Sequence, residues 1–356
     1  MINTLGIIMR KKVLFLALFA ILACGCEPKK LCPVGGENGA IGKPSQIEKY
    51  LNDKKIPAMK SVQQWENPYD PGLKISTKHY DIFTTLMDPL ILAQLPGFME
   101  ACYSGYQGQL PEPIDTQTKF TVYFFATRKQ WDDFTKTFIP EQAETYSRIK
   151  SGAYYLNGSC VTYNIGRDKT FSVLAHEGWH QFNSRHFTYR LPSWLDEGIA
   201  MQFESFREND GTFYFEPDKN IQRLAGLKKT IVEGKMIPLE ILISINPGEV
   251  ISANSDSAVI AFYGQAYALV RFLREENYGK RLADYKSMLF DGLRGNWPLQ
   301  GQAKQVASDR NINITVGWNR LVGRYLFEKY IGDDFENLQQ EYICFCRKIV
   351  YHVHLK

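Results

Sequence analysis

The feature of this sequence that most restricts its fold is the segment His176-Glu177-Gly178-Trp179-His180. The surrounding residues predict a helix over 169–183, and positions i and i+4 of a helix lie on one face. Both imidazoles can therefore reach one metal ion, with Glu177 directed toward a water on that ion. Two unrelated surface histidines are the alternative, but a chain with six histidines rarely forms this spacing by chance. We expect a metal-binding helix.

Zinc is the metal that two imidazoles in this arrangement favour, and it lowers the pKa of a bound water to about 7. Glu177 can then take the proton of that water as general base and return it to a leaving group as general acid. A catalytic zinc also needs a third protein ligand and one open position. The sequence offers two candidates for this third ligand.

The first candidate is His186, six residues after His180. This gives the histidine spacing that is typical of metzincins, which carry a glycine where this chain has Asn183. Asparagine tolerates a left-handed backbone, so His186 stays possible. The second candidate is Glu197, in the segment Leu191-Pro192-Ser193-Trp194-Leu195-Asp196-Glu197-Gly198-Ile199-Ala200.

Ser193 and Asp196 have the spacing of a capping box, which predicts that a helix begins at Ser193 and runs to about Phe206. The capping role would occupy Asp196 and leave Glu197 free to project elsewhere. If this helix packs on the first, it can bring the Glu197 carboxylate to the metal.

These two segments together resemble the gluzincin branch of zinc peptidases, and the chain is most similar to bacterial peptidase-MA-like proteins with a DUF1570-type domain. The similarity covers roughly residues 78–275. It implies one zinc ion per chain, held by His176, His180 and Glu197, with Glu177 as the catalytic residue. It also implies an α+β, zincin-like fold, in which a mixed-sheet subdomain precedes a helical subdomain and the active-site cleft lies between them. The implied reaction is hydrolysis of peptide bonds in a peptide or protein substrate.

A second resemblance involves Gly152-Ala153-Tyr154-Tyr155, followed by Val161-Thr162-Tyr163. These residues are similar to the edge-strand signature G-A-M-E-N and V-T-Y of zinc aminopeptidases. In that family the strand pairs with the substrate backbone, so Gly152, Ala153, Tyr154 and Tyr155 are expected to bind substrate. The family's glutamate, which binds a free amino group, is replaced by Tyr155. This replacement favours an endopeptidase.

A third resemblance involves Tyr263-Gly264-Gln265-Ala266-Tyr267, which is similar to a Y-E-K-G segment whose tyrosine stabilises the tetrahedral intermediate. Tyr263 is therefore expected to assist the oxyanion. It is also one of the apolar residues on the same face of a predicted helix over 263–276, so a core role is the alternative. Tyr267, one turn later, is the other tyrosine able to serve.

The N-terminus predicts export. Arg10, Lys11 and Lys12 precede an apolar run over 13–23, which is too short to span a membrane. Ile21-Leu22-Ala23-Cys24 resembles a bacterial lipobox, so we expect a signal peptide over 1–23, lipidation of Cys24 and a tether over 24–45. Cys26 is the alternative lipid site, a plain cleaved signal is the alternative processing, and Met9 is an alternative start. The resemblance places the protein in the bacterial cell envelope, bound to a membrane through its lipid.

The remaining chain is expected to divide into an α+β part over 46–190 and a helical part over 191–356. The net charge of +4 falls to about +1 without the three basic residues of the signal. With no basic stripe or stacking motif in addition, we expect no nucleic-acid partner. A binding protein that retains a peptidase fold without useful turnover is the alternative function.

Overall fold

The computed structural model describes residues 43–114, 116–147, 149, 152–252, 255–312 and 316–355. The expected signal peptide over 1–23, the lipid site Cys24 and all but the end of the expected tether over 24–45 lie outside these residues. The first described helix, α1, begins at Pro44, so the end of that tether is helical. Within the described ranges, no helix combines the length and the apolar character needed to cross a membrane.

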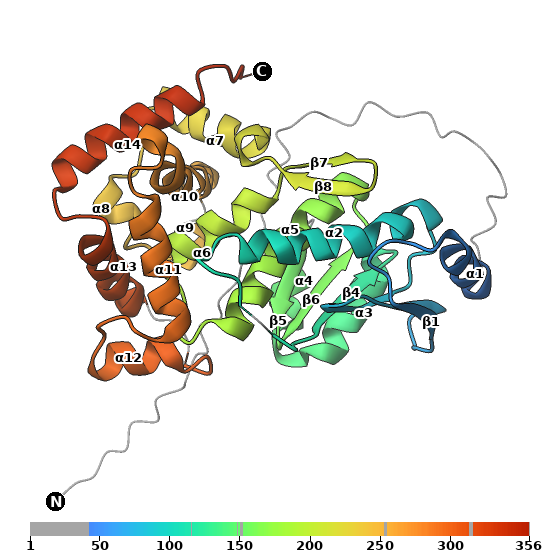
Figure 1. The fold of residues 1–356 in the computed structure, drawn as a ribbon. Helices are drawn as coiled ribbons and strands as arrows, with labels where there is room; N and C mark the ends of the chain where they lie inside the picture. Colours follow the sequence, from blue (N-terminus) through green and yellow to red (C-terminus); the bar gives the residue numbers. More distant parts are fainter. Residues whose placement is uncertain are drawn as a thin grey trace, which may run out of the picture.

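A six-stranded mixed sheet forms the N-terminal part, with the strand order β1-β2-β3-β4-β6-β5 (Figure 1). The strands are β1 (Ser61–Trp65), β2 (Gly72–Ser76), β3 (Tyr80–Thr84), β4 (Phe120–Phe125), β5 (Ala153–Leu156) and β6 (Ser159–Tyr163). β3, β4 and β6 run parallel, whereas β1, β2 and β5 pair antiparallel with their neighbours. β5 therefore forms one edge of the sheet.

Helices cover both faces of this sheet. On β4, Phe120, Val122 and Phe124 belong to the main core together with α2 and α5, whereas Phe125 packs in a second cluster with Trp131 of α3. A strand covered on both faces can carry apolar residues at consecutive positions, as β4 does from Val122 to Phe125.

Helices make up most of the described residues outside the sheet, both between its strands and after them. The helices are α1 (Pro44–Lys54), α2 (Pro89–Gln107), α3 (Arg128–Phe138), α4 (Ala143–Ser147), α5 (Arg167–His186), α6 (Ser193–Ala200), α7 (Ile221–Val232), α8 (Leu239–Leu242), α9 (Pro247–Ser252), α10 (Asp256–Glu275), α11 (Leu282–Arg294), α12 (Gly301–Ser308), α13 (Val316–Tyr330) and α14 (Phe335–Ile349). A hairpin of β7 (Phe206–Asn209) and β8 (Thr212–Phe215) separates α6 from α7. α10 packs against α6, α7, α9 and α14 at the centre of the C-terminal helices (Figure 1). The chain is thus α+β, as the sequence predicted.

α2 corrects one expectation. Proline usually interrupts a helix, so the sequence over 85–107 favours breaks at Pro89 and Pro96. Instead, α2 begins at Pro89 and continues through Pro96. Pro89 suits the first helical position because the amide it lacks would have no partner there. Asp88 caps this end by accepting hydrogen bonds from the amides of Leu90 and Ile91. Pro96 is buried, and packing of α2 against α5 and β8 holds the helix despite one missing hydrogen bond.

Candidate metal centre

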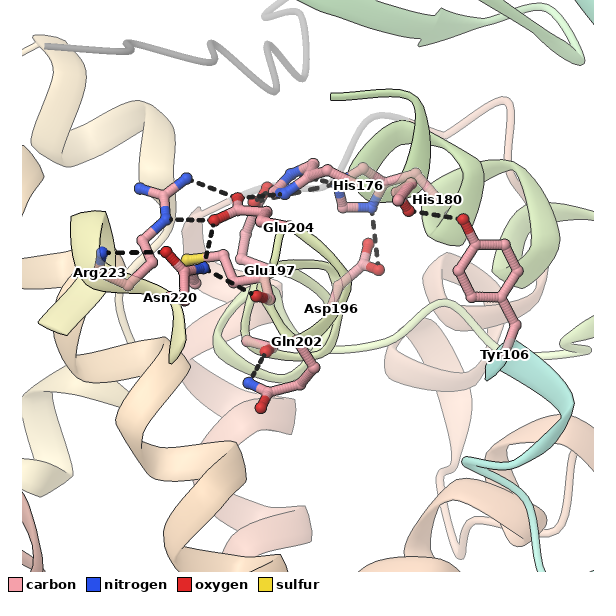
Figure 2. A network of polar contacts seen from close by, with 12 residues as sticks. Tyr106, His176, His180, Asp196, Glu197, Gln202, Glu204, Asn220 and Arg223 are labelled. Atoms are coloured by element: carbon pink, nitrogen blue, oxygen red, sulfur yellow. Dashed lines mark hydrogen bonds and ion pairs between the residues drawn. The ribbon is translucent and has the colours of Figure 1, made fainter. Parts of the chain in front are cut away.

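Two successive helices bring three potential ligands together. α5 carries His176 and His180, and α6 carries Glu197. The Nε2 atoms of the two histidines are 3.2 Å apart, and the Oε2 atom of Glu197 lies 3.4 Å from Nε2 of His176 and 3.9 Å from Nε2 of His180. Figure 2 shows the three side chains pointing toward one another. They form the one group of three or more candidate metal-ligating side chains found among the described residues.

The orientation of the imidazoles fits a cation between them. Nδ1 of His176 lies 2.9 Å from Glu204 and Nδ1 of His180 lies 3.1 Å from Asp196, so each Nδ1–H faces a carboxylate. In that tautomer both Nε2 atoms present lone pairs to each other and to Glu197. Such an arrangement is repulsive without a cation, and carboxylates behind ligating histidines are a common feature of zinc sites.

The charge around the two imidazoles also favours a bound cation. His176, Glu177, His180 and Glu197 are all buried. Burial lowers the pKa of His180, but the carboxylates of Asp196, Glu197 and Glu177 outweigh it and raise this pKa to about 10. Excess negative charge therefore surrounds the imidazoles, which favours a divalent cation. Oε2 of Glu197 also has no hydrogen-bond partner among the described residues, as expected of an atom reserved for a metal.

Glu177 has the environment of a general base. Both of its carboxylate oxygens are buried without a hydrogen-bond partner in the described part of the chain. Burial raises the pKa of Glu177 to about 7, even though His180 and His176 act to lower it. A carboxylate with a pKa near neutrality can both accept and return a proton at physiological pH.

Close packing of α6 on α10 sets the position of Glu197. A Cβ atom on Gly198 would lie 2.6 Å from the carbonyl oxygen of Ala266, so only glycine allows this approach. The side-chain amide of Gln202 reinforces the contact by donating to the carbonyl oxygens of Gly198 (2.6 Å) and Tyr267 (3.2 Å). The ligand next to Gly198 is thereby tied to the C-terminal helices.

Asp196 corrects a second expectation. The predicted capping box is wrong, because Pro192 occupies the N-cap of α6 and no side chain caps this end. Asp196 instead turns toward α5, where its Oδ1 accepts hydrogen bonds from Trp179 (2.9 Å) and Asn183 (2.9 Å) and faces His180. Its function is therefore to orient a candidate ligand.

Glu204 was missed by the sequence reasoning. α6 ends at Ala200, a 3-10 turn spans Met201–Phe203, and Glu204 follows, facing His176. Burial raises the pKa of Glu204, but the charge and hydrogen bonds of Arg223 and the contact with His176 lower it to about 2. Its spacing from Glu197 could have identified it. Glu204 lies seven residues after Glu197, so the two side chains would share one face of a continuous helix.

His186 stands apart from this group. It ends α5, and its ring packs 4.6 Å from the ring of Phe182 and 5.7 Å from that of Phe120. Burial and the charge of Arg185 lower its pKa to about 4, so the ring is neutral near pH 7. Among the described residues, the structure joins Glu197, and not His186, to the two histidines of α5.

Tyr263 lies on α10 near the ligands. Burial raises the pKa of Tyr263 well above its ordinary value, and the nearby Glu197 carboxylate raises it further. The fallback, Tyr267, has a different role, because its hydroxyl donates to the carbonyl oxygen of Pro217 and accepts from Arg271. Tyr263 is therefore the better placed of the two tyrosines.

Ala153, Tyr154 and Tyr155 lie in β5, the edge strand beside α5, and Gly152 immediately precedes it. Ala153 packs with Val173 of α5, whereas Tyr154 faces the opposite side of the sheet, with its hydroxyl 2.9 Å from Thr135. β5 packs against α5, so this edge strand runs beside the helix that carries the candidate base.

No protein-family model, curated protein or solved structure matches this chain. The geometry of the candidate metal centre is therefore the main indication of function. That geometry is a buried His-His-Glu group with an oriented imidazole pair and an unpartnered carboxylate beside it.

Proposed function

We propose that this chain is a zinc-dependent peptidase of the gluzincin type. The observation that carries the proposal is the convergence of Nε2 of His176, Nε2 of His180 and Oε2 of Glu197, with each imidazole held from behind by a carboxylate. Two imidazoles and one carboxylate form a typical ligand set for catalytic zinc, and three protein ligands leave one coordination position open.

When bound, zinc supplies a Lewis acid that polarises a carbonyl group and lowers the pKa of water. Glu177 holds the proton that is taken from the attacking water and returns it to the leaving amine. Its raised pKa, about 7, suits both steps. The unpartnered oxygens of Glu177 support this role over the alternative of a binding protein, because a purely structural metal site needs no such carboxylate.

Tyr263 and β5 complete the proposed site. The phenol of Tyr263 would donate a hydrogen bond to the developing oxyanion. The edge strand β5 would align an extended peptide by adding it to the sheet, along the backbone of Gly152, Ala153, Tyr154 and Tyr155. We also propose a zincin-like fold, which the mixed sheet, the helix α5 with its two histidines and the following helices support.

The proposed location follows from the N-terminal sequence. A lipid on Cys24 would hold the domain on a membrane of the bacterial envelope, facing the periplasm or the exterior. Mass spectrometry of the protein from a bacterial host tests this: we expect a diacylglyceryl group on Cys24, and an unmodified N-terminus would contradict it.

Zinc content tests the proposed site directly. We expect about one zinc per chain in the protein without residues 1–26 and in His186→Ala, and loss of zinc in Glu197→Gln. Loss in His186→Ala instead would reassign the third ligand. If the zinc-loaded protein cleaves no member of a diverse peptide library, the binding-protein alternative replaces the peptidase.

A further inference from the structure

The first turn of α7 is built around Glu204. Asn220 caps the helix by accepting a hydrogen bond from the amide of Arg223 (3.2 Å). The side-chain amide of Asn220 donates to Oε2 of Glu204 (2.8 Å) and to the carbonyl oxygen of Met201 (3.2 Å). The start of α7 is therefore fixed relative to the carboxylate that faces His176.

Arg223 binds the same carboxylate through two nitrogens. Its Nε donates to Oε2 of Glu204 at 2.8 Å and its Nη2 donates to Oε1 at 2.7 Å. Oε1 of Glu204 in turn lies 2.9 Å from Nδ1 of His176 (Figure 2). A planar guanidinium in a bidentate contact fixes the orientation of a carboxylate, which a single lysine nitrogen does not do.

Arg223 also contacts the candidate oxyanion residue. Its guanidinium carbon lies 5.4 Å from the centre of the Tyr263 ring, within the range of a cation–π contact. Both side chains are buried, with Arg223 8% and Tyr263 6% exposed. α7 and α10 pack closely here, since a Cβ on Gly264 would lie 3.0 Å from the amide nitrogen of Leu227. One guanidinium thus lies against two parts of the site.

We propose that Arg223 is a positioning residue that couples the ligand His176, through Glu204, to the phenol of Tyr263. The inference rests on the proposed peptidase function for its catalytic part only. Arg223 sets the angle of the Glu204 carboxylate, and hence of the His176 ring, while it holds the Tyr263 ring from the other side. A displacement of Arg223 therefore disturbs metal affinity and oxyanion stabilisation together.

The test uses the full chain and the variants Arg223→Met, Arg223→Lys, Tyr263→Phe and Arg223→Met/Tyr263→Phe. Arg281→Met is the matched control, because Arg281 is also buried, pairs with Glu276 and Glu341, and lies 4.4 Å from the Phe272 ring. Zinc affinity is measured by competition with a chromogenic chelator. kcat and KM are measured at saturating zinc with a cleaved peptide.

We expect Arg223→Met to weaken zinc binding by about 10- to 100-fold, Arg223→Lys to restore part of it, and Arg281→Met to leave it unchanged. At saturating zinc, Tyr263→Phe should lower kcat by about 100-fold in the wild-type background but less than about threefold beside Arg223→Met, with KM little changed. Unchanged zinc affinity in both Arg223 variants, or a full effect of Tyr263→Phe beside Arg223→Met, would overturn the proposal.

Failure of the peptidase function is distinguishable from failure of this coupling. If the wild type cleaves no peptide, the wild type, Arg223→Met, Tyr263→Phe and the double variant are unfolded in urea without metal. We then expect the changes in unfolding free energy of Arg223→Met and Tyr263→Phe to be non-additive, because the two side chains are in contact. Additive changes would overturn the coupling, whatever the activity of the protein.

Discussion

Asp196 stands behind His180, with its Oδ1 atom 3.1 Å from Nδ1 of the imidazole. The same oxygen accepts hydrogen bonds from Trp179 and Asn183, so one atom joins the start of α6 to three residues of α5. This contact crosses the turn between the two helices that supply the ligands. The geometry of the candidate metal centre therefore depends on a residue outside its three candidate ligands.

Replacement of Asp196 should weaken metal binding. We expect Asp196→Ala to raise the dissociation constant for zinc by about 10- to 100-fold, because His180 loses the carboxylate that orients it. The indole N–H of Trp179 would also lose its partner, at a cost of about 1–3 kcal/mol in unfolding free energy. Chelator competition and urea unfolding measure the two effects. Wild-type zinc affinity would contradict the orienting role.

Replacement of Glu177 should separate activity from metal binding. We expect Glu177→Gln to lower kcat by about 100- to 10,000-fold while zinc content stays at about one per chain. Unfolding free energy should stay equal or rise, because the variant removes a buried carboxylate whose oxygens have no hydrogen-bond partner among the described residues. Retained hydrolysis would remove Glu177 from the mechanism.

Addition of a methyl group at Gly198 should disturb both folding and the ligand. In Gly198→Ala the new Cβ would lie 2.6 Å from the Ala266 carbonyl oxygen and from Cγ2 of Val270. We expect a loss of about 1–3 kcal/mol in unfolding free energy and weaker zinc binding. Gly97→Ala on α2 is the control: its Cβ would be no nearer than 3.7 Å to the closest atom, so it should stabilise the helix slightly.

Removal of the metal should lower the melting temperature. Zinc at a thousand times its dissociation constant would stabilise the fold by about 4 kcal/mol, provided that the unfolded chain binds it weakly. We expect a chelator to abolish this gain in the wild type and to change nothing in Glu197→Gln. Differential scanning calorimetry measures both. A melting temperature independent of zinc would count against a metal centre.

Acid should remove a specific contact outside the candidate metal centre. Glu100 on α2 accepts hydrogen bonds from the hydroxyl of Thr77 (2.6 Å) and the amide of His79 (2.8 Å). Burial raises the pKa of Glu100, but these hydrogen bonds outweigh it and hold this pKa below its ordinary value of 4.5. Because the unfolded chain then binds more protons, the stabilisation is present above that value and disappears as the pH falls below it.

We therefore expect Glu100→Gln to cost about 1–2 kcal/mol of unfolding free energy at pH 7 and clearly less at pH 3. Urea unfolding at both values measures the difference. The exposed Glu141→Gln serves as the control and should show no such change. A cost for Glu100→Gln that is independent of pH would mean that the charge of this carboxylate does not contribute.

Local patterns were sufficient where neighbouring residues decide the structure. The helix that carries His176 and His180 and the helix that begins at Ser193 were both predicted correctly from short segments. Glu197 was one of two candidates for the third metal ligand. The packing of α6 against α5 and α10 places it beside the two histidines. Patterns of a few residues carry such information because side-chain direction follows helix or strand geometry.

Contacts between residues far apart in the sequence could not be predicted from such patterns. Arg223 lies on α7 and binds Glu204, and no spacing in the sequence indicates this pair. Asp196 has the sequence position of a capping residue. Its carboxylate instead contacts the buried indole of Trp179 and the imidazole of His180. Strands β1 and β2 were not predicted, because their alternating polar residues give weak strand signals until the sheet forms.

The contact of Gly198 with Ala266 also limits how this centre could be transplanted. A designer who copied the two ligand segments onto a new scaffold would transfer all three donor atoms but not the distance between them. That distance depends on how closely α10 approaches α6, and a scaffold helix with ordinary spacing would leave the Glu197 carboxylate too far from the histidines. The smallest portable unit is therefore three helices, one of which supplies no ligand.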